Sequence, residues 1–387
     1  MSEWKTQPLS DLADIVTGAT PAAAQTDSWG NEVDFITPSD QKDNQREAQA
    51  ARRLSSVGAR RLTKRIVPAR STNLTCIGST IGKVSMTQSA AVTNQQINSI
   101  IARRPVSDPD FIYYLIKNWS GSLKDHASGS ATPIINKSVL SKFEFLVPPV
   151  YEQRAIAEVL GALDDKIAAN TKLASSAEEL ISVHFQRAIE SEGTTSRSLF
   201  EVIDVDFGEP FKGSDFSDPG TGRPLIRIRD LKTFTSQVWT TENRSREILI
   251  QPGEVVVGMD AEFRPTTWLG EPGLLNQRVC RARGKSAGPA FVRETLRAPL
   301  RRIESSKSAT TVIHLNKKDL DEAKVLVPGS ESLVAFETAV EALYSLQVSI
   351  ALENRLLATT REALLPQLVT GKLKVKDAEK VLEDAGV

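Results

Sequence analysis

The sequence predicts an α+β chain in which two copies of one mixed domain are separated by two long helices packed on each other. Three observations lead to this prediction. Short motifs recur in the same order in both halves, the character of each half changes after a Leu-Val-Pro motif, and the segments beyond that motif carry a heptad pattern. The 387 residues suffice for two or three domains.

The composition is that of a soluble globular protein, with 40% hydrophobic and 25% charged residues. Cys76 and Cys280 lie far apart, which indicates a reducing compartment and no disulfide framework. Residues 1–10 hold no apolar stretch of signal-peptide length, and no segment approaches about 18 continuous apolar residues. We therefore expect a cytoplasmic protein without a membrane span.

The repeat is seen in six motifs whose spacing drifts slowly, which indicates loop insertions between two copies of one domain. The matching sets are Leu9-x-x-Leu12-x-Asp14 with Leu199-x-x-Val202-x-Asp204, Ile36 and Asp40 with Ile226 and Asp230, Asn94-Gln95-Gln96 with Asn276-Gln277-Arg278, Ser130-Ala131-Thr132 with Ser308-Ala309-Thr310, Leu146-Val147-Pro148 with Leu326-Val327-Pro328, and Asn170 with Asn354.

Before the Leu-Val-Pro motif, short apolar runs alternate with clusters of Gly, Pro, Ser and Thr, which is typical of short strands and turns. In the first copy we expect strands near 34–37, 71–77, 99–102 and 143–147, and a helix over 109–119. The mixture of short strands and a few helices makes each copy an α+β domain.

Beyond the motif, apolar residues recur at alternating spacings of four and three, the pattern of a coiled-coil seam. The expected seams are Ile156, Leu160, Leu163, Ile167, Asn170, Ala174, Ala177, Ile181 and His184 in the first segment, and Phe336, Val340, Leu343, Gln347, Ile350, Asn354, Leu357, Arg361 and Leu364 in the second. A helix over 151–190 would be ~60 Å long. Neither helix can bury its stripe alone, so we expect them to pack on each other.

Two features of these helices leave questions open. Asn170 and Asn354 are either polar residues tolerated at a partly exposed seam or a pair that locks the register. Apolar residues outside the seam would need the surface of a partner protein, and these are Val159, Leu173, Leu180, Leu346 and Leu356.

The motifs that follow resemble one family. The run Val147-Pro148-Pro149-x-x-Glu152-Gln153-Arg154-Ala155-Ile156-Ala157 with Leu160-x-x-Leu163-Asp164 resembles the conserved-region helix of the specificity (S) subunit of type I restriction–modification enzymes. The opening Gly18-x-Thr20-Pro21, the middle Gly78-x-x-Ile81-Gly82-Lys83 and the tail Leu364-Leu365-Pro366 are similar to that family too.

The resemblance implies two target recognition domains separated by an antiparallel pair of spacer helices. It places target recognition domains at 1–150 and 193–330, and spacer helices at 151–192 and at 331–387, the last with a C-terminal tail. It also implies a non-catalytic subunit that reads a bipartite duplex DNA site and positions adenine methylation. Its partners would be two methyltransferase subunits and motor–nuclease subunits.

The residues themselves give no sign of catalysis, cofactor or metal. Pro148-Pro149 lacks the Asn or Asp and the aromatic residue of an adenine methylase motif, and the three histidines show no metal-ligand spacing. The Gly78–Lys83 run has one residue too few between its glycines for a phosphate-binding P-loop. We expect Lys83 either to meet a DNA phosphate or to belong to a structural hairpin.

Two basic stretches, 46–70 and 278–302, are read as occupying corresponding parts of the two copies and as contacting the DNA backbone. Gln and Arg can read adenine and guanine edges, although residues shared by both copies are expected to hold the domain rather than to specify bases. The candidate DNA-binding residues are Arg60, Arg61, Lys64, Lys83, Gln95, Gln96, Arg264, Gln277, Arg278, Arg301 and Arg302. The alternative is a coiled-coil adaptor that binds proteins and not specific DNA.

Overall fold

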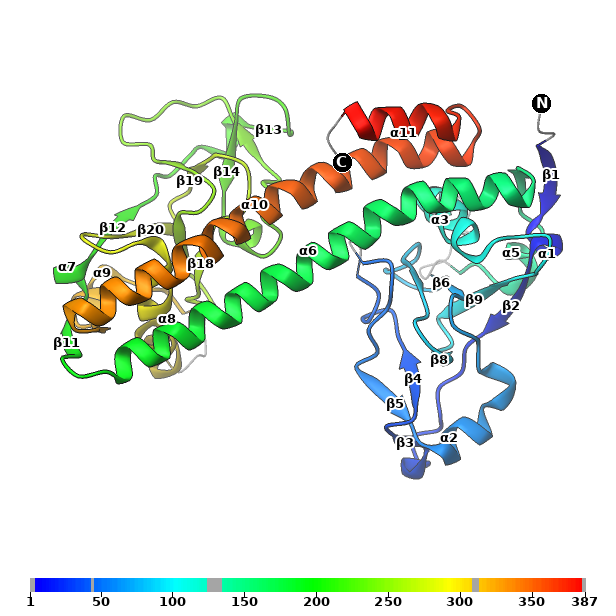
Figure 1. Ribbon diagram of the computed structural model, residues 1–387, viewed down its shortest axis with the longest axis horizontal. Coiled ribbons are helices and arrows are strands. Elements are labelled where there is room, and N and C mark those ends of the chain that lie inside the picture. Colours follow the sequence, from blue (N-terminus) through cyan, green and yellow to red (C-terminus); the bar gives the residue numbers. More distant parts are fainter. Residues whose placement is uncertain (1–3, 43–44, 124–133, 308–312, 385–387) are drawn as a thin grey trace. The chain divides into compact units, whose positions relative to one another are not determined.

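The chain forms two units, each of which contains one mixed domain and part of both long helices. The computed structural model describes residues 4–42, 45–123, 134–307 and 313–384 (Figure 1). One unit comprises Met1–Ala168 with Leu356–Val387, and the other comprises Ala169–Arg355. The repeated Ser-Ala-Thr motifs at 130–132 and 308–310 lie outside the described residues.

In the first unit, a four-stranded antiparallel sheet forms the centre of the domain. Its strands, in spatial order, are β2 (Ala13–Thr17), β9 (Ile97–Ala102), β6 (Thr72–Thr75) and β7 (Val84–Met86). Helix α3 (Pro109–Ser120) packs against this sheet. It begins sharply because the Asp108 carboxylate accepts bonds from the Asp110 and Phe111 amides and Pro109 occupies the first turn.

A second, smaller sheet holds the basic segment of this unit. It contains β3 (Trp29–Gly30), β5 (Arg52–Leu54), β4 (Val33–Ile36) and β8 (Ala91–Thr93), and β4 pairs with β8 in parallel. This unit also contains β1 (Lys5–Pro8), which pairs with β10 (Glu144–Val147), the short helices α1 (Leu9–Leu12), α2 (Ser56–Arg61) and α5 (Lys137–Leu140), and α11 (Val375–Asp384) near the C-terminus.

The second unit repeats this topology, which confirms the predicted duplication. Its central sheet has the order β12 (Ile203–Phe207), β20 (Val279–Gly284), β17 (Val255–Gly258) and β18 (Pro265–Thr267), covered by α8 (Pro289–Ser306). The second sheet has five short strands, one more than its counterpart in the first unit, in the order β13 (Phe216–Ser217), β15 (Trp239–Thr240), β14 (Arg223–Ile226), β19 (Gly273–Leu275) and β16 (Leu249–Ile250). Strand β11 (Thr195–Ser198) pairs with β21 (Lys324–Val327), and α7 (Leu199–Val202) and α9 (Lys317–Asp321) complete the domain.

The motifs common to both copies make the same backbone contacts. The amide of Gly18 bonds to the Ile97 carbonyl, and the amide of Gly208 bonds to the Val279 carbonyl. A Cβ at Gly18 would lie 2.2 Å from the Asn94 oxygen, so no larger residue fits this approach. The amides of Asn94 and Asn276 bond to Ile36 and Ile226 in the same way. These shared residues therefore build the fold.

Helices α6 (Val150–Glu190) and α10 (Ser330–Val369) run antiparallel within each unit. In the second unit, Asn170 Nδ2 donates to Asn354 Oδ1 at 3.0 Å, while Glu178, farther along α6, bonds to Gln347, earlier on α10. In the first unit, Asp164 bonds to Arg361. Together with the repeated mixed domains, this confirms the predicted fold class.

Most of the predicted seam lies inside this packing. The buried members of the set are Ile156, Leu160, Leu163, Asn170, Ala177, Ile181, Phe336, Val340, Gln347, Ile350, Leu357, Arg361 and Leu364, whereas Ile167, Ala174, His184, Leu343 and Asn354 are half-buried. Near the end of α6, Phe185, directly after His184, is buried although it lies outside the predicted seam. The Phe185 ring packs against Phe291 and Phe336, which a strict heptad count does not foresee.

On length and composition alone, α10 would qualify as a membrane span. Several of the residues that make it apolar, among them Phe336 and Val340, belong to the core of the second unit. Core helices of soluble proteins satisfy the same criteria, so this observation is weak evidence for a membrane location.

A buried ion pair joins α6 to α10 in the first unit. Arg361 NH1 lies 2.5 Å from Asp164 Oδ1, and the Tyr114 hydroxyl of α3 donates to Asp164 Oδ2 at 2.7 Å. The side chains of Asp164 and Arg361 are only 5% and 3% exposed. Removal of one partner would leave the other charge buried and unpaired.

We therefore expect Arg361→Met to lower the free energy of unfolding by ~3–5 kcal/mol, because Asp164 loses its counter-charge. The double variant Asp164→Asn/Arg361→Met should recover most of that loss. Urea unfolding followed by circular dichroism measures both, with Arg154→Met, at an exposed position of α6, as the matched control. Equal losses for the control and for Arg361→Met would contradict a structural role for the pair.

Candidate nucleic-acid interface

Several exposed basic residues of the first unit lie on α2 and on the 3₁₀ helix η2 (Thr63–Arg65) that follows it. Ser55 starts α2 by accepting a bond from the Gly58 amide at 3.1 Å. Arg60, Arg61 and Lys64 are all exposed on this segment. Arg60 and Lys64 are four residues apart, and their side chains make no ion pair with any described residue.

Other cations of this segment are held by neighbouring groups. Arg61 makes a bidentate pair with Asp27, at 2.5 and 2.9 Å, and its hydrogen bond lowers the pKa of the Asp27 carboxyl. Arg53 pairs with Asp34 at 2.8 Å, and the Arg52 guanidinium stacks 3.4 Å from the centre of the Trp29 ring. Arg60 and Lys64 are therefore the cations of this surface that are best placed to meet a partner.

Lys83 is engaged within the domain. Its ammonium group donates to the carbonyls of Gln41 at 3.1 Å and Pro38 at 3.4 Å, and its side chain is half-buried. Gly78 and Gly82 form the turn before it, with φ values of +86° and +92°. This geometry favours the structural-hairpin alternative over a contact with a phosphate.

The amide side chains lie in equivalent turns of the two units. Gln95 is exposed, and its Oε1 accepts from Thr20 at 2.6 Å, while Gln96 Oε1 accepts from Asn94 at 3.0 Å. In the second unit Gln277 and Arg278 are both exposed. Arg278 Nε lies 3.7 Å from the Asp260 carboxylate. The same position of the turn is therefore an amide, Gln96, in the first copy and a cation, Arg278, in the second.

The predicted correspondence between the two basic stretches was wrong. The first lies on β5, α2 and η2, whereas the second lies on β20 and α8, which are the counterparts of β9 and α3. Several of its members form internal ion pairs instead of an open basic surface. Arg281 pairs with Asp206 at 2.8 Å and Glu254 at 3.0 Å, and the buried Arg293 pairs with Glu178 at 2.6 Å and Glu294 at 3.2 Å.

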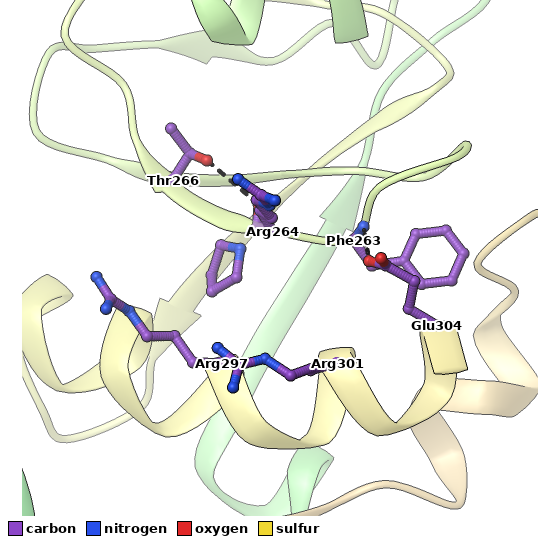
Figure 2. Close-up of a pocket in the computed structure, with 7 residues that line it drawn as sticks. Phe263, Arg264, Thr266, Arg297, Arg301 and Glu304 are labelled. Carbon is purple, nitrogen blue, oxygen red and sulfur yellow. Dashed lines mark hydrogen bonds between the residues drawn. The ribbon is translucent and has the colours of Figure 1, made fainter. Parts of the chain in front are cut away.

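Three further candidate residues of the second unit are exposed: Arg264, Arg301 and Arg302. Arg264 and Arg301 line a cavity of about 610 Å³ together with Arg297 (Figure 2). Arg297 belongs to the predicted basic stretch 278–302, although it was not among the candidate DNA-binding residues. It stands four residues before Arg301 on one helix and so shares a face with it. Among the described residues, no group of three or more His, Cys, Asp or Glu side chains could hold a metal ion.

The first part of the chain matches a known protein family, and the whole chain has similar relatives. Residues 1–179 match the family described as Type I restriction modification DNA specificity domain. The chain is 23% identical to the MjaIX type I restriction enzyme specificity subunit of Methanocaldococcus jannaschii, over 97% of this chain and 94% of that protein. It is 40% identical to the HindI specificity subunit of Haemophilus influenzae, over 38% of this chain and 32% of that protein.

The fold gives a matching result. The S subunit of a type I restriction–modification system from M. genitalium superimposes with a TM-score of 0.59 at 14% identity, covering 95% of this chain and 96% of that one. This likeness concerns the fold, while the sequence relationship comes from the curated relatives. Along nearly its whole length the chain is thus similar in sequence to a type I restriction enzyme specificity subunit, and its first 179 residues match the DNA specificity domain of such enzymes.

Proposed function

We propose that this protein is the non-catalytic, cytoplasmic DNA-recognition subunit of a type I restriction–modification complex and binds a bipartite duplex target. The observation that carries the proposal is a duplicated domain whose shared backbone contacts build the fold while one position of a shared turn differs. The half-buried Gln96 and the exposed Arg278 stand two residues after Asn94 and Asn276 in equivalent turns. Gln suits adenine and Arg suits guanine in the major groove, so each copy can read a different half-site.

The boundaries of the proposed target recognition domains, 1–150 and 193–330, agree with the ends of the long helices. Helix α6 begins at Val150 and ends at Glu190, and α10 begins at Ser330. Residues 151–192 and 331–387 would then supply the spacer and the C-terminal tail. In this arrangement the number of helical turns in the spacer sets the distance between the two half-sites.

The exposed apolar residues of the long helices support a protein partner, which we take to be the methyltransferase subunits, with motor–nuclease subunits joining the same complex. Leu173, Leu180 and Leu356 are about half exposed, at 48%, 49% and 50%. Two expectations about this surface need correction. Val159 is buried in the core of the first unit, and Leu346 is half-buried.

DNA binding by the full-length chain tests the proposal directly. Each neutralised phosphate contributes about −0.9 to the slope of log affinity against log salt. We expect Arg60→Ala and Lys64→Ala each to make this slope shallower by about one and to weaken binding uniformly across sequences. Lys142→Ala, which removes an exposed charge elsewhere in the same unit, is the matched control. A wild-type chain whose duplex affinity does not depend on salt would favour the protein-binding adaptor instead.

The spacer can be tested by inserting seven residues into both helices, next to Asn170 and Asn354. Seven residues keep the seam in phase and lengthen each helix by ~10 Å. That length corresponds to about three base pairs, at ~3.4 Å each. Because ~10.5 pairs make one turn, the second half-site also rotates by nearly a third of a turn.

We expect methylation to weaken after this insertion and the remaining activity to prefer a longer gap between unchanged half-sites. Methylation mapping on targets of graded spacing measures the preference. An unchanged preference in a folded variant would remove the helices from this role.

The partner surface can be tested with Leu173→Gln and Leu180→Gln. Both residues are half exposed on α6, so we expect the free energy of unfolding of the isolated chain to change by no more than about 0.5 kcal/mol. Affinity for the methyltransferase subunit should fall, as measured by calorimetry or by co-purification. Lys172→Gln alters an exposed neighbour of Leu173 and serves as the control. Wild-type affinity in both leucine variants would place the partner elsewhere.

A further inference from the structure

A cavity in the second unit is lined by three arginines that approach it from two elements. Arg297 and Arg301 lie on α8, and Arg264 is the residue directly before β18 (Figure 2). Phe263, Pro265, Thr266 and Glu304 complete the lining of this cavity, which has a volume of about 610 Å³. All seven residues belong to the same unit.

One of these arginines is held in place by ion pairs with two glutamates. Arg297 forms an ion pair with Glu178 and a second with Glu294 at 3.2 Å. Glu294 is itself only 3% exposed and is bound by Ser182 at 3.1 Å. The guanidinium of Arg297 is therefore held in position, with its charge compensated, at the wall of the cavity.

The other two arginines supply positive charge. Arg301 makes no ion pair with any described residue, and Arg264 approaches Glu262 only to 3.8 Å. The single acid of the lining, Glu304, accepts a bond from the Phe263 amide at 2.9 Å. Because Glu178 and Glu294 offset the charge of Arg297, the charge that favours an anion comes from Arg264 and Arg301, against the one carboxylate of the lining, Glu304. Guanidinium matches the oxygens of a phosphate in bidentate geometry.

Among the residues of the first unit that the structure describes, the equivalent positions do not hold such a group of cations. The position before β7 is Lys83, which is bonded to the Pro38 and Gln41 carbonyls. On α3, Lys117 stands where Arg297 stands on α8, and it donates to the Tyr113 hydroxyl at 3.1 Å. Gly121 stands at the position of Arg301. The arginine cavity is thus a property of the second copy and not of the shared fold.

We infer that this cavity binds a single backbone phosphate of duplex DNA beside the half-site read by the second domain. The inference rests on the proposed function. Phosphate contacts fix the register of a protein on DNA without reading sequence. Arg264 and Arg301, on opposite sides of the cavity, would hold the same phosphate, whereas Arg297, which donates to Glu178 and Ser182, would line the cavity beside it.

The test measures duplex binding by the full-length chain with a fluorescent mixed-sequence duplex over a range of salt concentrations. Arg264→Ala and Arg301→Ala should each weaken binding. The double variant should make the salt slope shallower by about one in total, because one phosphate is lost. Lys318→Ala, whose side chain is 85% exposed on α9, removes a charge of the same unit outside the cavity as a control. Unchanged thermal midpoints verify folding, since both arginines are exposed.

The possible results separate the alternatives. A slope change of about two in the double variant would mean two separate phosphates, and no change would mean no contact, so either result overturns the inference while leaving the proposed function intact. Failure of the wild-type chain to bind the duplex at low salt would overturn both. Binding of inorganic phosphate or ATP that the double variant abolishes, with duplex binding unaltered, would assign the cavity to a free phosphorylated ligand.

Discussion

Neither long helix can bury its apolar stripe alone, and the seam between α6 and α10 therefore supports both domains. In the first unit the core that contains Phe111 and Tyr114 of α3 also contains Leu160 of α6 and Leu364 of α10. In the second unit, Phe291 of α8 packs with Phe185 of α6 and Phe336 of α10. The helices are thus part of each domain's core, and a change in the seam affects the folding of the domain beside it.

The polar groups beside this seam differ between the units although they occupy equivalent places. Tyr114 of α3 bonds to Asp164, which pairs with Arg361, whereas the α8 positions equivalent to Tyr113 and Tyr114 are Arg293 and Glu294. Arg293 in turn bonds to Glu178 and to Gln347. Buried charges are tolerated only with their own partners, so each domain helix is matched to its own stretch of α6 and α10.

The sequence predicted the elements that depend on local pattern. The helix expected over 109–119 is α3, Pro109–Ser120, and the strand expected over 143–147 is β10, Glu144–Val147. The heptads predicted both long helices because an apolar stripe is a property of spacing alone. The pairing of charges does not depend on spacing along the sequence in this way. Arg281 and Arg293 belong to a basic stretch in the sequence, but their carboxylate partners, Asp206 and Glu178, come from distant segments.

The same distinction explains why the candidate interface was harder to predict than the fold. The shared glycines and asparagines act through backbone bonds, such as Gly18 to Ile97 and Gly208 to Val279, and these bonds place few demands on neighbouring side chains. The position before β7 or β18 can then carry Lys83, which anchors a loop from within, or Arg264, which faces a cavity. Because the backbone carries the fold, exposed positions in the two copies can diverge without loss of the core, and a duplicated domain can acquire two different surfaces.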